Sequence, residues 1–334
     1  MTPRISVLLP CRDVAATLGE ALDSLVRQTF DDFEVIAVDD GSSDGTAAVL
    51  ERWRRGDGRI RVVRTPALGI VAALRRAAAE ARGELLARMD ADDVARQDRF
   101  AEQVAWLDRH PDAVGCGALV RYFPREGLRD GARRYERWIN AQVAPHEIAR
   151  DLFVECPIPH PTLVLRRRAH DAAGGYRDAA WPEDYDLVLR LAAAGATLGK
   201  VPEVLLAWRD GPSRLSRAAA AYSEDAFRRC KARYLGPLRL RGRCVVVWGA
   251  GPVGKAFARA LAHEGHEIRA FVDLDPRKIG QVIHGAPVIA PDAVHEHRGG
   301  YVIAAVGQEG ARDDIRRALV DLGWREVDEF CAVA

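Results

Sequence analysis

The chain has 334 residues, of which 48% are hydrophobic and 29% charged, and its formal net charge at pH 7 is +1. This composition is typical of a globular protein with a sizeable core, and the length favours two domains. The near-neutral charge argues against a nucleic-acid binder. Six scattered cysteines without a Cys-x-x-Cys pair indicate reduced thiols rather than a disulfide framework or a zinc site.

The N-terminus lacks the apolar segment of a secretion signal, and no apolar run approaches the roughly 18 residues of a spanning helix. We therefore expect a soluble cytoplasmic protein without a transmembrane segment. Peripheral contact with a membrane and assembly into a homo-oligomer stay open. Two arginine clusters are compatible with a solvated face or with attraction of an anionic acceptor. They are Arg125, Arg129, Arg133, Arg134 and Arg137, and residues 166–168.

Strand and helix patterns alternate from the N-terminus onward. Short apolar runs predict buried strands, and apolar residues at helical spacing predict helices. The expected elements are a strand over Ile5 to Leu9 ended by Pro10, a helix through Leu18, Leu22 and Leu25, a strand over Phe33 to Val38, a helix over Ala47 to Trp53 capped by Ser43 or Asp44, a strand over Ile60 to Val63, a helix over Ile70 to Ala81 and a strand over Glu84 to Ala87. This order predicts a doubly wound α/β sheet, whose ligands bind beyond the carboxyl ends of its parallel strands.

Two acidic clusters directly follow predicted strands. Asp39 and Asp40 precede a Gly-Ser-Ser-Asp-Gly turn, where small residues let backbone amides approach a ligand. Carboxylates at this position accept hydrogen bonds from ribose hydroxyls or a base N–H, although turn chemistry explains the turn residues equally well.

The second cluster places Asp90, Asp92 and Asp93 within four positions. Like charges this close are tolerated when they are solvated, partly protonated or neutralised by a cation. An all-oxygen set suits Mg²⁺ or Mn²⁺, and an acidic turn that caps the next helix is the alternative.

A third acidic group begins a later helix pattern and consists of Glu183, Asp184 and Asp186. Asp184 is a candidate general base, because a carboxylate within hydrogen-bond reach can accept a hydroxyl proton. Acidic residues also interact favourably with the dipole at a helix N-terminus, and Asp186 with Arg190 is an i,i+4 pair. His160, between two prolines, either lines an acceptor pocket or forms a structural hydrogen bond.

The strand and helix alternation begins again near residue 244. A strand over Cys244 to Trp248 leads into Gly249, Gly251 and Gly254, and the next strand ends in Asp273. Strand, glycines, helix and acidic strand end form the dinucleotide-binding fingerprint. The remaining chain is little more than half a full dinucleotide fold. We expect a small Rossmann-like domain that either binds a nucleotide or serves in packing and assembly.

Taken in order, these motifs resemble glycosyltransferase family 2. The motifs that carry the resemblance are Arg4 to Pro10, Leu25 to Phe30, Glu34 to Thr46, Arg88 to Asp93, Arg96 to Phe100 with Gln103, Pro159 to Thr162, Gly174 to Arg177 and Glu183 to Leu187. The resemblance covers about residues 4–217. It implies a GT-A domain over 1–235, with 218–235 as a helical connector. The second domain, over 236–334, resembles the Rossmann-like domains beside some sugar-modifying transferases.

The resemblance implies a nucleoside diphosphate sugar donor and transfer of the sugar, with inversion, to an acceptor hydroxyl. Asp39 would contact the nucleobase with Asp40 close by, and Asp90 would face the ribose or the metal. Asp92 would ligate Mn²⁺ or Mg²⁺, which bridges the diphosphate. Asp184 would be the base. The acceptor, whether glycan, lipid-linked sugar, peptide or metabolite, cannot be read from the sequence.

The chain departs from the family pattern at several positions. After Pro10, many members carry an aromatic residue and Asn, whereas this chain has Cys11, Arg12 and Asp13 there, and Arg12 could stack on a base. Arg75 replaces a frequent Asn and could pair with the diphosphate. Gly211 stands where many relatives have a histidine ligand, so metal coordination would rely on Asp92, phosphate and water.

Two other functional classes stay open. An NAD-dependent oxidoreductase would use the C-terminal glycines as its active centre, but no Tyr-x-x-x-Lys set accompanies them. A noncatalytic scaffold would bind a nucleotide sugar without turnover. Within the transferase interpretation, Glu183 and Asp186 would support the base.

Overall fold

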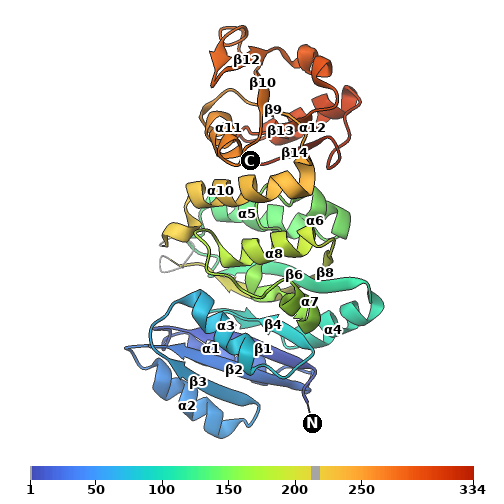
Figure 1. Cartoon of the computed structure of the whole chain (residues 1–334). Helices are drawn as coiled ribbons and strands as arrows, with labels where there is room; N and C mark the ends of the chain where they lie inside the picture. The colour runs from blue at the N-terminus through green and yellow to red at the C-terminus, as the bar shows by residue number, and fades with distance from the viewer. Residues whose placement is uncertain (1, 212–218) are drawn as a thin grey trace. The chain divides into compact units, whose positions relative to one another are not determined.

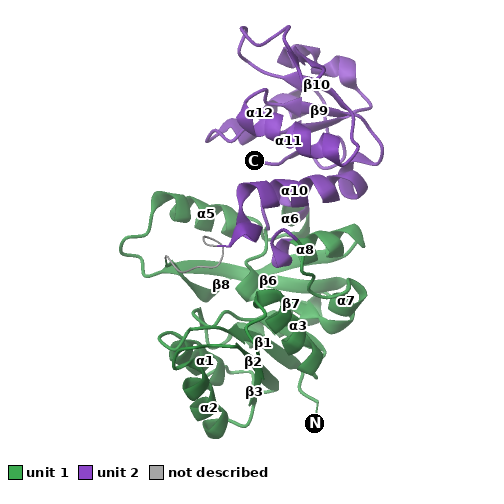
Figure 2. Ribbon diagram, turned by 60° about the vertical axis from the view of Figure 1, so that its left-hand side comes forward, with its two compact units in different colours: residues 1–148, 157–179, 186–218 green, residues 149–156, 180–185, 219–334 purple. Residues whose placement is uncertain are grey.

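The computed structural model describes residues 2–211 and 219–334, which form two compact units (Figure 2). The N-terminal unit consists of Met1–Ile148, Pro157–Ala179 and Asp186–Ala218. The C-terminal unit consists of Ala149–Cys156, Ala180–Tyr185 and Ala219–Ala334, so two short internal segments belong to it as well. No helix in the described ranges is long and apolar enough to cross a membrane.

The N-terminal unit contains an eight-stranded sheet in the order β3-β2-β1-β4-β7-β6-β8-β5 (Figure 1). Its strands are β1 (Ile5–Cys11), β2 (Phe33–Asp40), β3 (Ile60–Thr65), β4 (Leu85–Arg88), β5 (Val94–Ala95), β6 (Ala113–Phe123), β7 (Val164–Arg166) and β8 (Thr197–Arg209). Strands β1 to β4 run parallel, whereas β7 is antiparallel to both β4 and β6. The carboxyl ends of β2, β1 and β4 therefore meet at one edge of the sheet.

Helices connect these strands, as the alternating pattern predicts. They are α1 (Leu18–Val26), α2 (Thr46–Gly56), α3 (Ile70–Glu80), α4 (Arg99–Arg109), α5 (Asp130–Ala141), α6 (Pro145–Asp151), the 3₁₀ turn η1 (His160–Thr162), α7 (Arg167–Ala172) and α8 (Glu183–Ala193). Leu18, Leu22 and Leu25 lie on one face of α1 and join the same buried core as alternate residues of β1. This shared core holds the strand ends in a fixed arrangement.

The prediction that Pro10 ends the first strand is wrong, because β1 continues to Cys11. The ladder between β1 and β4 ends at Leu8, whereas the ladder between β1 and β2 runs to Cys11. Pro10 thus lies where β1 pairs with one neighbour, and proline is better tolerated at such positions.

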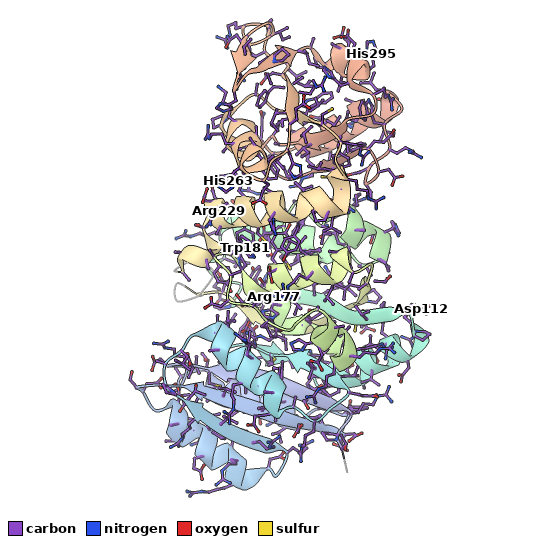
Figure 3. The ribbon with its side chains drawn as sticks, viewed as in Figure 1. Asp112, Arg177, Trp181, Arg229, His263 and His295 are labelled. Atoms are coloured by element: carbon purple, nitrogen blue, oxygen red, sulfur yellow. The ribbon has the colours of Figure 1, made fainter. Side chains whose placement is uncertain are left out.

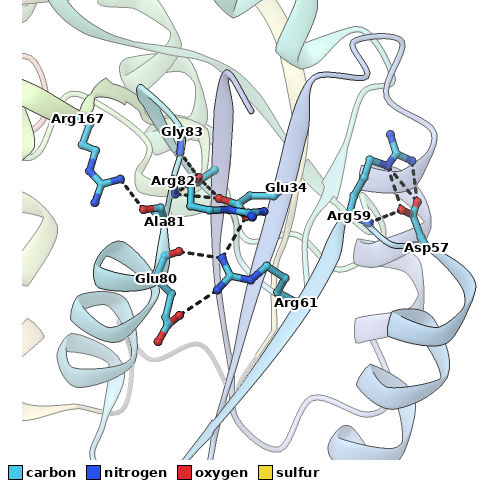
Figure 4. A network of polar contacts seen from close by, with 10 residues as sticks. Glu34, Asp57, Arg59, Arg61, Glu80, Ala81, Arg82, Gly83 and Arg167 are labelled. Carbon is cyan, nitrogen blue, oxygen red and sulfur yellow. Dashed lines mark hydrogen bonds and ion pairs between the residues drawn. The ribbon is translucent and has the colours of Figure 1, made fainter. Parts of the chain in front are cut away.

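Glu34 is a buried carboxylate in the otherwise largely apolar strand β2, and it joins several elements (Figure 4). Ser6 donates to its Oε1 at 2.7 Å, while Arg61 and Arg82 donate to its Oε2 at 3.1 and 2.6 Å. Burial opposes ionisation, but these hydrogen bonds lower the pKa of Glu34. The network fixes β1, β2 and β3 together at the edge where Ser6 and Arg82 lie, so we assign it a structural role.

The C-terminal unit contains a six-stranded sheet in the order β11-β12-β10-β9-β13-β14. Its elements are η2 (Ala220–Tyr222), α10 (Glu224–Leu235), the π-helical turn η3 (Gly236–Leu240), β9 (Val245–Trp248), α11 (Pro252–His263), β10 (Ile268–Val272), β11 (Val282–Ile283), β12 (Ala286–Ile289), η4 (Pro291–His297), β13 (Tyr301–Ala304), α12 (Ala311–Asp321) and β14 (Phe330–Ala332). All neighbouring strands except β11 and β12 pair in parallel. The strand order changes direction between β9 and β13, as in doubly wound sheets.

The expected connector begins at Ala218, which lies outside the described residues. Its described part contains η2 and α10. Ser223 caps α10, because its hydroxyl accepts a hydrogen bond from the Ala226 amide.

Candidate functional site

The last two residues of β2 are the buried carboxylates Asp39 and Asp40. Oδ1 of Asp39 accepts a hydrogen bond from the Ser42 amide at 3.1 Å, which closes the turn after the strand. Gly41 in this turn has φ +67°, and a Cβ there would lie 2.6 Å from the Ala67 nitrogen. The glycine is therefore required both by the backbone conformation and by the close approach of the neighbouring loop.

Asp40 orders the loop that leads into α3. Its two carboxylate oxygens accept hydrogen bonds from the Leu68 and Gly69 amides at 2.8 and 2.9 Å. The exposed Arg12 approaches the same carboxylate, with 3.5 Å between Nη1 and Oδ2. Arg12 directly follows β1, which contains the buried Pro10. The strand ends thus combine an internally bonded carboxylate with an exposed guanidinium.

Three carboxylates gather after β4. Asp90, Asp92 and Asp93 each offer an oxygen, and these oxygens lie within 4.8 Å of one another. Asp90 and Asp92 are half-buried and Asp93 is buried. An all-oxygen donor set of this size fits a hard divalent cation such as Mg²⁺ or Mn²⁺.

Two buried guanidinium groups lie beside these carboxylates. Arg88, the last residue of β4, forms an ion pair with Oδ1 of Asp90. Arg99, the first residue of α4, donates to the Arg88 carbonyl at 2.8 Å and to Oε1 of Gln103 at 3.0 Å. Burial lowers the pKa of Arg99 to about 10, and the charge of Asp93 opposes this shift. Both arginines are therefore cationic at neutral pH and offset part of the negative charge.

Sequence reasoning placed Arg88 and Arg99 in family motifs but gave them no role. Their positions in the sequence do indicate that both side chains are buried. Arg88 directly follows an apolar strand, and Arg99 precedes the core residue Phe100 in an amphipathic helix. A charged residue in such surroundings is buried when it has partners.

Arg209, the last residue of β8, holds the acidic loop from the opposite strand of the sheet. Its amide donates to Oδ1 of Asp93 at 2.8 Å, and its Nε donates to the Asp92 carbonyl at 2.7 Å. The guanidinium also pairs with Glu20 and lies 4.4 Å from the centre of the Phe123 ring. Two residues later comes Gly211, the position at which many relatives are expected to have a histidine ligand. Sequence reasoning missed this role because the contacts of Arg209 are distant in sequence.

Two further predicted site residues lie in the N-terminal unit. Arg75 is exposed on α3. His160 is buried at the start of η1, and its Nε2 lies 2.9 Å from the hydroxyl of Tyr176. Burial and then the charge of Arg88 lower the pKa of His160, so its ring is neutral at pH 7. The contact with Tyr176 fits a structural hydrogen-bonding histidine, and a place in an acceptor pocket stays a prediction.

Glu183 and Asp184 begin α8 and belong to the C-terminal unit, whereas Asp39, Asp90 and Asp92 belong to the N-terminal unit. Glu183 is buried, and Oε2 accepts a hydrogen bond from the Tyr222 hydroxyl at 2.7 Å. Asp184 is half-buried.

The surroundings of Asp184 favour its protonated form. Burial, followed by the charges of Glu183 and Glu155, raises its pKa to about 8, although the Tyr185 amide donates to Oδ1 at 2.7 Å. A carboxylate with this pKa is a stronger base than an exposed aspartate and is able to exchange a proton near neutral pH.

The glycines between β9 and α11 have different structural reasons. Gly249 has φ +122°, and a Cβ there would lie 2.7 Å from the Ala305 carbonyl oxygen. A Cβ on Gly254 would lie 1.8 Å from the Gly249 oxygen, whereas one on Gly251 would meet no atom within 4 Å. Gly249 and Gly254 therefore permit close packing of the loop, and Gly251 faces open space.

Asp273, which follows β10, bonds to this glycine loop. Its Oδ2 accepts hydrogen bonds from the Ala250 amide at 3.0 Å and from Lys278 at 2.8 Å, and its Oδ1 accepts one from the Asp275 amide at 2.9 Å. Partial burial opposes ionisation, but the Lys278 and amide hydrogen bonds lower the pKa of Asp273. In this structure the carboxylate ties the loop to the end of β10.

The chain is similar to known glycosyltransferases. A model of glycosyl transferase family 2 matches residues 6–174. The amylovoran biosynthesis glycosyltransferase AmsE of Erwinia amylovora is 30% identical over 201 residues, which are 60% of this chain and 73% of that protein.

Solved structures show the same fold. TarS 1–349 of S. aureus in complex with UDP-GlcNAc has 18% identity and a TM-score of 0.56, over 78% of this chain and 71% of that one. The mannosyltransferase PcManGT from Pyrobaculum calidifontis, in complex with GDP-Man and Mn²⁺, has 23% identity and a TM-score of 0.51, over 70% and 62%. The expected α/β fold with a GT-A domain is confirmed, and a second sheet is present.

Proposed function

This chain belongs to glycosyl transferase family 2, and we propose that it transfers a sugar from a nucleoside diphosphate sugar to an acceptor hydroxyl with inversion, in glycan or glycoconjugate biosynthesis. Family membership makes it a glycosyltransferase rather than an oxidoreductase or a noncatalytic scaffold. The observation that carries the proposed reaction is the set of three carboxylates after β4, supported by two buried arginines. A cytoplasmic location stays a prediction.

We assign the donor diphosphate to this carboxylate set. Asp92 and Asp90 would hold Mn²⁺ or Mg²⁺, which neutralises charge that develops on the departing diphosphate. The similar mannosyltransferase was solved with GDP-Man and Mn²⁺, which supports this assignment. Arg88 and Arg99 would limit the repulsion between the carboxylates before the donor binds. Arg209 would keep the loop in place through the Asp92 carbonyl.

The nucleoside would be bound at the ends of β1 and β2. Asp39 would accept a hydrogen bond from the base, and Asp40 would keep the loop before α3 ordered. Arg12 would stack its exposed guanidinium on the base after the buried Pro10. Arg75, exposed on α3, would pair with the diphosphate. The similar structure with bound UDP-GlcNAc supports a donor of this class.

Asp184 would act as the general base. The acceptor oxygen would form a bond to the anomeric carbon while the bond from that carbon to the diphosphate breaks. Asp184 would accept the acceptor proton, and the nucleoside diphosphate would leave with the bonding electron pair. One displacement of this kind inverts the anomeric carbon and needs no protein nucleophile. The pKa near 8 supports a proton acceptor that works around neutral pH.

For residues 236–334 we propose a Rossmann-like domain that serves mainly in packing and assembly. The carboxylate of Asp273 already bonds to the glycine loop and to Lys278, which supports a structural role. Nucleotide binding at Gly249, Gly251 and Gly254 is the second interpretation. The open space at Gly251 favours it.

A donor screen tests the proposed reaction. The full-length protein is incubated with UDP-GlcNAc, GDP-mannose and related donors, with Mn²⁺ or with EDTA, and nucleoside diphosphate release is measured. We expect Asp92→Asn and Asp184→Asn each to lower the rate about 100- to 10,000-fold, and EDTA to abolish it. Asp112→Asn, in the exposed turn after α4, is the matched control and should retain the wild-type rate (Figure 3).

Two outcomes would contradict the proposal. The donor assignment fails if no donor is hydrolysed or transferred in the presence of either metal. The base assignment fails if Asp184→Asn is as active as Asp112→Asn.

A further inference from the structure

The segment that carries Asp184 is held by side chains of the C-terminal unit (Figure 2). The Tyr222 hydroxyl donates to Glu183 at 2.7 Å, and Arg229 donates to the Ala180 carbonyl at 3.2 Å. The Tyr185 hydroxyl donates to the Leu152 carbonyl at 2.6 Å. Figure 3 shows Arg229 on α10 and Trp181, the residue after Ala180. Residues 180–185 thus have a hydrogen bond near each end and one at Glu183.

The second internal segment, 149–156, is held by the last part of the chain. The buried Lys231 on α10 donates to the Val154 carbonyl at 2.6 Å and to the Val333 carbonyl at 2.9 Å. Arg316 on α12 pairs with the buried carboxylate of Asp151. Because Tyr185 bonds to Leu152 in this segment, the start of α8 is connected to α10, α12 and the C-terminal residues.

Two neighbouring carboxylates act on Asp184. Glu183, its chain neighbour, and Glu155, from the 149–156 segment, both disfavour its ionisation. Lys231 and Arg312 are cations that interact with Glu155, and Arg229 pairs with Asp225 at 3.0 Å. Tyr222 differs from these cations because a hydroxyl orients a carboxylate without cancelling its charge.

We propose that the C-terminal unit holds the catalytic base in place, with Tyr222 as the positioning residue that keeps Glu183 oriented beside Asp184. The inference rests on the proposed function, since it takes Asp184 as the base. It gives the C-terminal unit a part in proton transfer that does not require a bound nucleotide. Tyr222 acts through Glu183, so its loss changes the strength of the base more than donor binding.

The test is the pH dependence of kcat for donor hydrolysis by the full chain, measured for Tyr222→Phe and Glu183→Gln. We expect kcat to fall about tenfold in Tyr222→Phe, the scale of a lost hydrogen bond to a charged group, while KM for the donor stays the same. Glu183→Gln removes the neighbouring charge, so Asp184 ionises at lower pH. The acid limb of the pH profile, which is the fall of kcat at low pH, therefore moves to lower pH. Tyr222→Phe lets Glu183 turn away from Asp184, so the acid limb of this variant moves in the same direction by less.

Tyr301→Phe is the matched control. It removes a buried hydroxyl of the same unit that donates to the Val327 carbonyl at 3.0 Å, and it should leave kcat and the acid limb unchanged. Wild-type kcat and acid limb in folded Tyr222→Phe would overturn the inference, and the proposed function would stand if Asp184→Asn were inactive. If Tyr222→Phe does not fold, an unshifted acid limb in Glu183→Gln overturns it. An active Asp184→Asn variant, or no turnover by the wild type, overturns both the inference and the proposed function.

Discussion

Each unit contains a carboxylate with two other acidic side chains nearby, but the surroundings of the two groups differ. Asp90, Asp92 and Asp93 in the N-terminal unit lie beside two buried guanidinium groups. The second trio, Glu155, Glu183 and Asp184 in the C-terminal unit, includes a carboxylate bonded by a neutral tyrosine hydroxyl and another bonded by a backbone amide.

The difference shows how the surrounding groups suit carboxylates to different roles. A fixed cation beside a carboxylate favours the charged form of that carboxylate, which is the form that binds a metal cation. Burial, followed by the charges of Glu183 and Glu155, makes Asp184 hold a proton more strongly, as its raised pKa shows. This difference supports the proposed roles of the N-terminal group as a cation site and of the C-terminal group as a proton acceptor.

Removing a buried counter-charge should have the largest effect on stability. We expect Arg88→Met to lower the free energy of unfolding by about 3–5 kcal/mol, because it leaves Asp90 without its buried ion-pair partner. Urea unfolding of the full chain, followed by tryptophan fluorescence, measures this change. The matched control is Arg96→Met, an exposed arginine paired with Asp98 and Glu203, for which we expect about 0–1 kcal/mol. Equal losses in the two variants would show that the compensation is unimportant.

Neutralising the candidate base Asp184 should have the opposite effect on stability and raise it. Its pKa in the folded chain lies above the unfolded value, so ionised Asp184 destabilises the fold. This cost is fully present above the folded pKa near 8 and disappears as the pH falls to the unfolded value. We expect Asp184→Asn to raise stability by about 1–2 kcal/mol at pH 9 and to have no effect near pH 4. Thermal unfolding at both pH values measures it, and a lower Tm at pH 9 would contradict the assignment.

Part of this comparison is readable from the sequence. Apolar runs locate β2, β4 and β10 within one or two residues, since strand formation depends on local pattern. Acidic residues after parallel strands then predict where Asp39 and Asp92 lie. The burial of Arg88 and Arg99 depends on contacts with other elements, which a local pattern does not contain.

The assignment of residues 180–185 to the C-terminal unit was also not predicted from the sequence. It follows from hydrogen bonds between residues far apart in the chain, such as Tyr222 with Glu183. The GT-A domain was expected to contain the whole stretch up to residue 235. Local sequence motifs therefore do not predict which distant side chains hold such a segment in place.

The smallest effect that we expect is that of a substitution at Arg209. It tests whether metal binding can change without a change in proton transfer. Arg209→Lys keeps a positive charge and the backbone bond to Asp93, but it loses the planar group that contacts the Asp92 carbonyl and the Phe123 ring. We expect the Mn²⁺ concentration for half-maximal activity to rise about fivefold. The acid limb of kcat should not move, because Asp184 sets it. A shifted acid limb with unchanged Mn²⁺ dependence would mean that the two carboxylate groups do not have separate roles.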